Sequence, residues 1–183
     1  MTRLFLEMNA VDIATRMADE QRVQLAPLIR AHDLAAPGKV FEDERVKVTA
    51  ALIDHPPITP AFAYRFDTAD RSIVISGDTK YSGNLIALAR GADVLVHESI
   101  YPEAVDRLVQ NVANAPDLKR SILSHHTSAE DVGRVAAAAG VKLLVLSHLI
   151  PAEDPQVTER MWLDAVGKHF KGPVVIGSDL ASL

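Results

Sequence analysis

Three segments of the chain place an acid or an imidazole at the end of an apolar run. They are residues 76–79 (SGDT), which follow Ile73-Val74-Ile75, residues 94–99 (VLVHES) and residues 144–148 (LVLSH). Short runs of β-branched and aliphatic residues are typical of buried strands. Open α/β sheets bind ligands and metals at strand ends, because the sheet holds the loop side chains in place. The three segments therefore predict an active site.

Three residues at these strand ends are candidate metal ligands. The Asp78 carboxylate could bridge two divalent ions, although an Asx-turn or a helix N-cap is also typical of an Asp after a strand. His148 ends an apolar strand, and His55 follows a strand predicted over residues 46–53. Neutral imidazole is a common metal ligand. The alternatives are a core histidine for His148 and an exposed loop histidine for His55.

A second pair of residues is suited to proton transfer. His125 and His126 precede a predicted helix, and Ser128 with Asp131 fits a capping box at its start. Glu98 follows the apolar run VLV and His97, so its carboxylate needs a partner, and a histidine is the obvious one. A paired histidine and glutamate can act as an oriented general acid or an oxyanion stabiliser.

Length and composition limit the class of protein. A chain of 183 residues with a formal net charge of -5 fits one domain, residues 1–183, without the basic field that general nucleic-acid binding needs. The absence of cysteine excludes disulfides, thiolate ligands and a cysteine nucleophile, so zinc would have to be held by histidine and carboxylate. No apolar run approaches the ~20 residues of a membrane span. We expect a cytoplasmic protein with no membrane partner.

The predicted elements that position these residues form two regions with different secondary structure. A helical pattern over residues 4–31 ends at Pro37-Gly38, and strands that read as antiparallel follow at 46–53, 61–66 and 72–75. From Gly83 onwards, helices and strands alternate, which predicts an α/β (α+β) protein whose sheet carries helices on at least one face. The predicted helices are 83–90, 102–112, 129–139 and 155–169, and the predicted strands are 93–96, 142–147 and 173–177.

Four motifs taken in order resemble a known family. The runs DHPPITPAFAYRF, IVISGDT, DVLVHES and HHTSAED…AGVKLLVLSH are similar to the C-terminal half of metallo-β-lactamase-fold hydrolases, in the branch of tRNase Z and the arylsulfatase-like hydrolases. The resemblance implies an αββα sandwich that binds two divalent ions, usually zinc. It implies hydrolysis of a phosphodiester, ester or sulfate by a zinc-bound hydroxide. Residues 1–40 would be a helical insert, and residues 46–183 the second β-layer with its helices.

The resemblance also implies a role for each candidate residue. His55 matches the family's ligand to the first metal ion, Asp78 the bridging carboxylate and His148 a ligand to the second ion. His126 matches the histidine that assists the leaving group or stabilises the transition state, and Glu98 would orient it.

One family motif is absent from the sequence. The His-x-His-x-Asp-His motif of the family's first half does not occur, because the histidines stand at positions 32, 55, 97, 125, 126, 148 and 169. We therefore expect the chain to begin inside the family's domain, with three ligands for two metal sites. Metal binding should be weak and turnover low.

Two functions follow as hypotheses. The chain is a metal-dependent hydrolase that is active in a longer form, or it is a catalytically silent half domain that associates with itself or with a complementary N-terminal half. The tRNase Z branch holds tRNA with a long flexible arm or basic patches, and the sequence shows neither. We therefore expect a small anionic or ester substrate rather than tRNA.

Overall fold

The computed structural model describes residues 2–110, 112, 113, 115–152 and 154–182. Their contacts divide the chain into two compact units, residues 1–35 and residues 36–183. Whether these units act as the single domain predicted over residues 1–183 stays a prediction. None of the helices in the described part of the chain has the length and apolar character needed to span a bilayer.

The first unit is helical, in agreement with the pattern of its sequence. It contains α1 (Thr2–Met8), α2 (Ala10–Asp19) and the short 3-10 helix η1 (Ala26–Leu28). Three apolar side chains of this unit, Ile13, Met17 and Leu25, are half-buried, and they line a small groove together with residues of α2 and η1.

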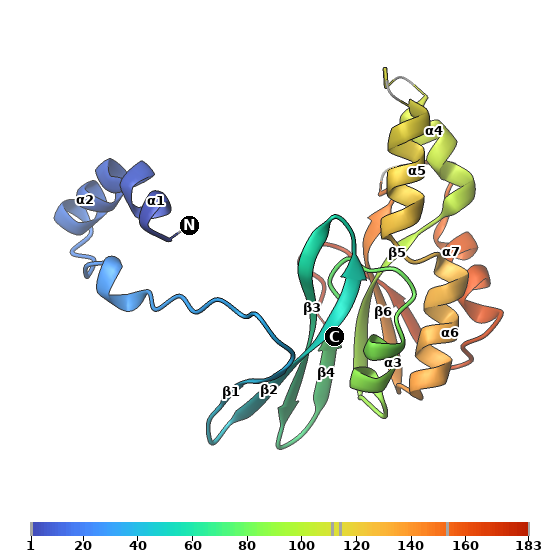
Figure 1. The fold of residues 1–183 in the computed structure, drawn as a ribbon, viewed down its shortest axis with the longest axis horizontal. Helices are drawn as coiled ribbons and strands as arrows, with labels where there is room; N and C mark the ends of the chain where they lie inside the picture. Colours follow the sequence, from blue (N-terminus) through green and yellow to red (C-terminus); the bar gives the residue numbers. More distant parts are fainter. Residues whose placement is uncertain (1, 111, 114, 153, 183) are drawn as a thin grey trace. The chain divides into compact units, whose positions relative to one another are not determined.

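The second unit contains one seven-stranded sheet in which the strands lie side by side in chain order (Figure 1). The first four strands pair as antiparallel neighbours, and the pairs from β4 to β7 are parallel. Short turns can join antiparallel strands, whereas parallel strands need a longer crossover. The strands are β1 (Gly38–Glu42), β2 (Val46–His55), β3 (Ile58–Thr68), β4 (Ser72–Ile75), β5 (Val94–Ile100), β6 (Leu143–Ile150) and β7 (Val174–Ile176).

The crossovers carry helices, and α3, α6 and α7 lie along the same side of the sheet (Figure 1). Side chains of β5 and β6 such as Leu95 and Leu144 are fully buried and belong to the same core cluster as Val132 of α6 and Val166 of α7. The helical elements of this unit are α3 (Gly83–Ala89), η2 (Pro102–Ala104), α4 (Val105–Val109), α5 (Ala115–His125), α6 (Ala129–Ala139) and α7 (Glu159–Gly167).

The other side of the sheet carries an apolar row. The strand register aligns Ala50, Tyr64, Ile75, Val96 and Val145 across five neighbouring strands. Directly opposed residues share one face of a sheet, and the next residue along each strand points to the opposite face. The row therefore lies opposite the helices, and Ile75 within it is 43% exposed.

The structure differs from the predicted elements in a few places. Strand β1 was not predicted, because its sequence GKVFE has a glycine and two charges and its pairing with β2 decides its conformation. Helix α5 was also missed. The helix predicted over 102–112 is the short η2 followed by α4, and the helix predicted from residue 155 begins at Glu159.

The contact between α6 and α7 provides a test of this packing. Replacing Gly133 by Ala should destabilise the protein, because the added methyl would overlap the backbone oxygen of Val166. Overpacking of this kind costs about 1–3 kcal/mol of unfolding free energy. Gly83→Ala is the matched control, since nothing lies within 4 Å of its added Cβ. Urea denaturation measures both variants, and an unchanged midpoint for Gly133→Ala would contradict the described packing.

Candidate active site

Three of the candidate residues lie at one edge of the sheet. His55 is the last residue of β2, Asp78 follows β4 by three residues, and His148 lies near the end of β6. Strand β3 runs antiparallel to both β2 and β4, so β2 points in the same direction as the parallel strands. All three residues therefore stand at carboxyl ends of strands, as the sequence predicts.

The turn that presents Asp78 depends on Gly77. Its φ of +61° is in the left-handed region, and an added Cβ would lie 3.3 Å from the backbone oxygen of Phe62. Glycine adopts this conformation at little cost, whereas other residues do not. The chain can therefore turn directly after β4 and present the Asp78 carboxylate beside the ends of the neighbouring strands.

His148 is positioned by an irregularity in β6. Ser147 pairs with Glu98 and Leu149 pairs with Ser99, so His148 is an extra residue in the strand. Its φ of +43° is rare for a residue other than glycine. An extra residue of this kind bends a strand and redirects a side chain, and such bulges are common beside active sites. The Nε2 atom of His148 lies 3.5 Å from Oδ2 of Asp78.

Glu98 is the buried acid of the site. Its Oε1 accepts hydrogen bonds from the backbone N–H of Thr79 at 3.2 Å and of Thr127 at 2.9 Å. The Thr127 hydroxyl donates to the backbone oxygen of Thr79 at 2.5 Å. Both threonines were missed in the sequence, although each directly follows a candidate residue, Asp78 or His126. They join the loop after β4 to the loop before α6.

The imidazole and carboxylate groups form one cluster. Ligand-type atoms of His55, Asp78 and His126 all lie within 4.8 Å of one another. The ring of His126 is centred 5.6 Å from that of His55 and 5.6 Å from that of His148. The structure thus brings the predicted ligands His55, Asp78 and His148 to one place and adds His126 to the set. The individual roles of these residues stay predictions.

Glu98 and His126 face each other, as expected from the sequence. Nδ1 of His126 lies 3.4 Å from Oε2 of Glu98, and the two side chains are 11% and 2% exposed. This carboxylate raises the pKa of His126 above the ordinary histidine value, and partial burial opposes the shift. Desolvation lowers the pKa of the neighbouring His125, as do the adjacent imidazoles. His126 is therefore the better suited of the two to carry a proton.

Comparison with known proteins decides the family. No protein-family model matches the chain. A ribonuclease Z homologue of Mycobacterium tuberculosis (strain CDC 1551) is 32% identical over 169 residues, which are 92% of this chain and 72% of that protein. The chain belongs to the ribonuclease Z family. Ribonuclease Z of Mycobacterium bovis (strain BCG / Pasteur) is also 32% identical, and there the match spans 58% of its length.

Solved structures agree with the family on the fold. The metallo-β-lactamase-fold protein YhfI of Bacillus subtilis has a TM-score of 0.58 at 19% identity, over 89% of this chain and 60% of its own. Human short-form tRNase Z has a TM-score of 0.51 at 20% identity, over 80% of this chain and 45% of its own. The predicted metallo-β-lactamase fold is confirmed for the part of the domain present. By family resemblance, this chain is related to metal-dependent hydrolases.

The contact between Glu98 and His126 can be tested by titration. Glu98→Gln should lower the pKa of His126 in metal-free protein, because the amide keeps an oxygen for Thr79 and Thr127 but loses the charge that favours imidazolium. A pKa raised above the unfolded value of about 6.5 contributes stability that is complete below that value and disappears as pH rises through the folded pKa. The variant should therefore lose stability mainly on the acidic side of the folded pKa.

Imidazole resonances followed by NMR against pH measure this shift. Glu103→Gln is the control, since Glu103 is an exposed carboxylate on η2. Identical His126 titrations in wild type and Glu98→Gln would contradict the described pair.

Proposed function

We propose that this chain carries catalytic groups of a metal-dependent phosphodiesterase that acts on RNA. The observation that carries the proposal is the convergence of His55, Asp78 and His126 within 4.8 Å, with Glu98 behind His126. The ribonuclease Z relatives support a phosphodiester substrate. Since the chain spans only 58% of one of them, the activity and substrate of the whole protein are part of the proposal.

The donor set at this edge fits a divalent metal such as zinc. Histidine nitrogen and carboxylate oxygen are both zinc ligands, and two ligand atoms of a tetrahedral ion lie about 3.4 Å apart. The 3.5 Å between Asp78 and His148 is close to that value. We propose that His55, Asp78 and His148 would hold the divalent ions that the family resemblance implies. A bound metal ion would lower the pKa of a coordinated water towards neutrality and polarise a phosphoryl oxygen.

His126 is then the proton donor. Its Nδ1 lies 3.4 Å from the Glu98 carboxylate, whose charge favours the protonated form, so Nε2 is the atom that can give a proton to the departing oxygen. A nitrogen that binds a metal cannot carry that proton at the same time. A carboxylate behind the ring is also found at metal-ligating histidines, so the acid role of His126 in this proposal rests on the family resemblance together with its raised pKa.

The bond that is cleaved can be identified by assay. The wild type should hydrolyse bis-p-nitrophenyl phosphate slowly in excess zinc, because three ligands hold the metal weakly. Asp78→Ala should reduce this rate by at least about 100-fold. His126→Ala should reduce cleavage of an RNA with a 3′ extension by about 100-fold or more, as expected for a lost general acid. It should reduce p-nitrophenolate release less, because that group leaves without a proton. Asp117 is an exposed carboxylate on α5, and Asp117→Asn should leave hydrolysis unchanged.

Parallel measurements separate the remaining substrates and the metal role. Zinc affinity from competition with a chelator should fall for Asp78→Ala and stay unchanged for Asp117→Asn. Rates are also measured with an RNA that has a 3′ extension, with p-nitrophenyl sulfate and with a p-nitrophenyl ester. These rates compare RNA with the small sulfate and ester substrates predicted from the sequence. Faster cleavage of the sulfate or ester than of both phosphodiesters would contradict the proposal.

A second candidate function is association, and the apolar row opposite the helices supports it. A contiguous apolar surface on a sheet typically packs against another surface. We propose that a second copy of this chain covers the row through Tyr64, Ile75 and Val96. A complementary N-terminal half is the other occupant that the family resemblance suggests.

Sedimentation equilibrium tests this association. Wild type should self-associate, and Ile75→Lys should shift the equilibrium to monomer, because a charge placed in an apolar interface must be desolvated. Val40→Lys is a matched control, since Val40 on β1 is also 43% exposed but lies outside the row. A wild-type monomer at every concentration would contradict self-association.

A further inference from the structure

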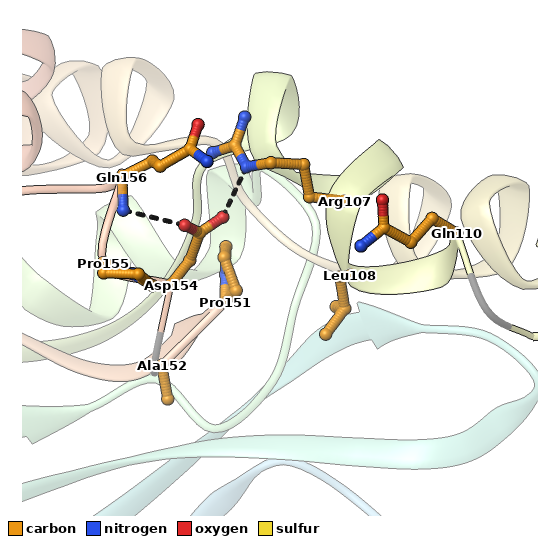
Figure 2. Close-up of a pocket in the computed structure, with 8 residues that line it drawn as sticks. All are labelled: Arg107, Leu108, Gln110, Pro151, Ala152, Asp154, Pro155 and Gln156. Carbon is orange, nitrogen blue, oxygen red and sulfur yellow. Dashed lines mark hydrogen bonds and ion pairs between the residues drawn. The ribbon is translucent and has the colours of Figure 1, made fainter.

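A second cavity, of about 580 Å³, lies between α4 and the loop that follows β6. Figure 2 shows Arg107 reaching from α4 to Asp154 in that loop, with Leu108 and Gln110 from the end of α4 and Pro151 and Gln156 from the loop around it. Its volume is in the range of small-molecule sites. We call it the Arg107 pocket. It lies outside the cluster around Asp78, and none of the roles described above uses it.

The guanidinium group of Arg107 is held in a fixed place. Its Nε donates to Oδ2 of Asp154 at 2.7 Å, and the backbone N–H of Gln156 donates to Oδ1 of the same carboxylate at 2.8 Å. These hydrogen bonds lower the pKa of Asp154, with that from Gln156 contributing most. The carboxylate is only 11% exposed, whereas Arg107 is 36% exposed. The Arg107 side chain is therefore partly accessible to a ligand.

The charges of the pocket balance. Its lining contains one cation, Arg107, and one anion, Asp154, in direct contact. A phosphate or carboxylate would gain little from a guanidinium that is already paired. An uncharged ligand with a flat face and polar edges fits better. Arginine planes stack on nucleobases, and side-chain amides such as those of Gln110 and Gln156 can donate to and accept from base edges.

The Arg107 pocket and the candidate active site both border one groove. Ala152 lines both the Arg107 pocket and a neighbouring groove that includes Ser147 and His148. Ser147 and His148 also line the hollow that contains Asp78 and Glu98. Pro151 is three residues from His148, and three residues of chain span at most about 10 Å. A ligand attached to a phosphate at the metal cluster can therefore extend into the pocket.

We infer that the Arg107 pocket binds one unpaired nucleobase of an RNA substrate, next to the phosphodiester that is cleaved. The base stacks on the guanidinium plane of Arg107, while Leu108 and Pro151 contact its apolar surface and the two glutamines bond its edge. This inference rests on the proposed function and deepens it by naming a part of the substrate that the protein recognises. Single-stranded RNA is commonly read through stacked, unpaired bases of this kind.

Binding of nucleosides to the full chain tests the inference without any catalytic step. Adenosine and cytidine are titrated separately into ¹⁵N-labelled protein, and ribose 5-phosphate is the probe that has the sugar and charge but no base. We expect at least one nucleoside to shift the backbone amides of Gln110 and Gln156 in a saturable manner. Ribose 5-phosphate should shift them much less.

The variants separate the pocket from the metal cluster. Arg107→Lys keeps the charge beside Asp154 but removes the stacking plane, so nucleoside affinity should fall by about fivefold or more. Gln110→Ala leaves the ion pair intact and should also weaken binding. Arg120→Lys, on the exposed pair with Asp117 in α5, is the matched control and should bind as wild type does.

Asp78→Ala should bind nucleosides normally. If the wild type binds nucleosides but does not cleave RNA, the proposed function is overturned and the pocket still stands. The nucleobase inference is overturned if no nucleoside shifts these amides, if Arg107→Lys binds like wild type, or if ribose 5-phosphate binds as tightly as the nucleosides.

Discussion

The candidate site depends on one buried carboxylate, that of Glu98. Burying a charge is costly unless hydrogen bonds replace its water, and here one oxygen accepts two backbone N–H groups while the other faces His126. The two donors belong to Thr79 and Thr127, which are 48 residues apart in sequence and are also joined by a hydroxyl-to-carbonyl hydrogen bond. Folding must therefore bring both loops to Glu98 together, and neither loop can move without leaving the carboxylate short of partners.

This constraint fixes Asp78 and His126, because each stands beside one of the threonines. Asp78 precedes Thr79, and His126 precedes Thr127. The end of β2 is joined to the same network, since the backbone N–H of Lys80 donates to the oxygen of Asp54 at 2.9 Å. His55 thus has a fixed position relative to Asp78. Side chains on loops acquire the precision of side chains on strands when their backbones are hydrogen-bonded in this way.

Much of this site could be predicted from the sequence, because an apolar run followed by a polar residue identifies the end of a strand. Apolar runs predicted β4, β5 and β6, and the acid or imidazole after each run indicated the edge at which they meet. The threonine contacts could not be predicted, since they join residues far apart in the chain. The bulge at His148 depends on the register between β5 and β6, and a register has no signature in one strand alone. Strand β1 was missed for the same reason, because its partner defines it.

The direction of the strands explains why His55 joins a site otherwise built from parallel strands. Strands β2, β3 and β4 form two successive hairpins, and two reversals return the chain to its first direction. The end of β2 is therefore at the same edge as the ends of β4, β5 and β6. An odd number of reversals would place His55 at the far edge, separated from Asp78 by the length of a strand, which is about 3.3 Å per residue. The antiparallel half of the sheet thus contributes a candidate ligand only because it contains an even number of turns between β2 and β4.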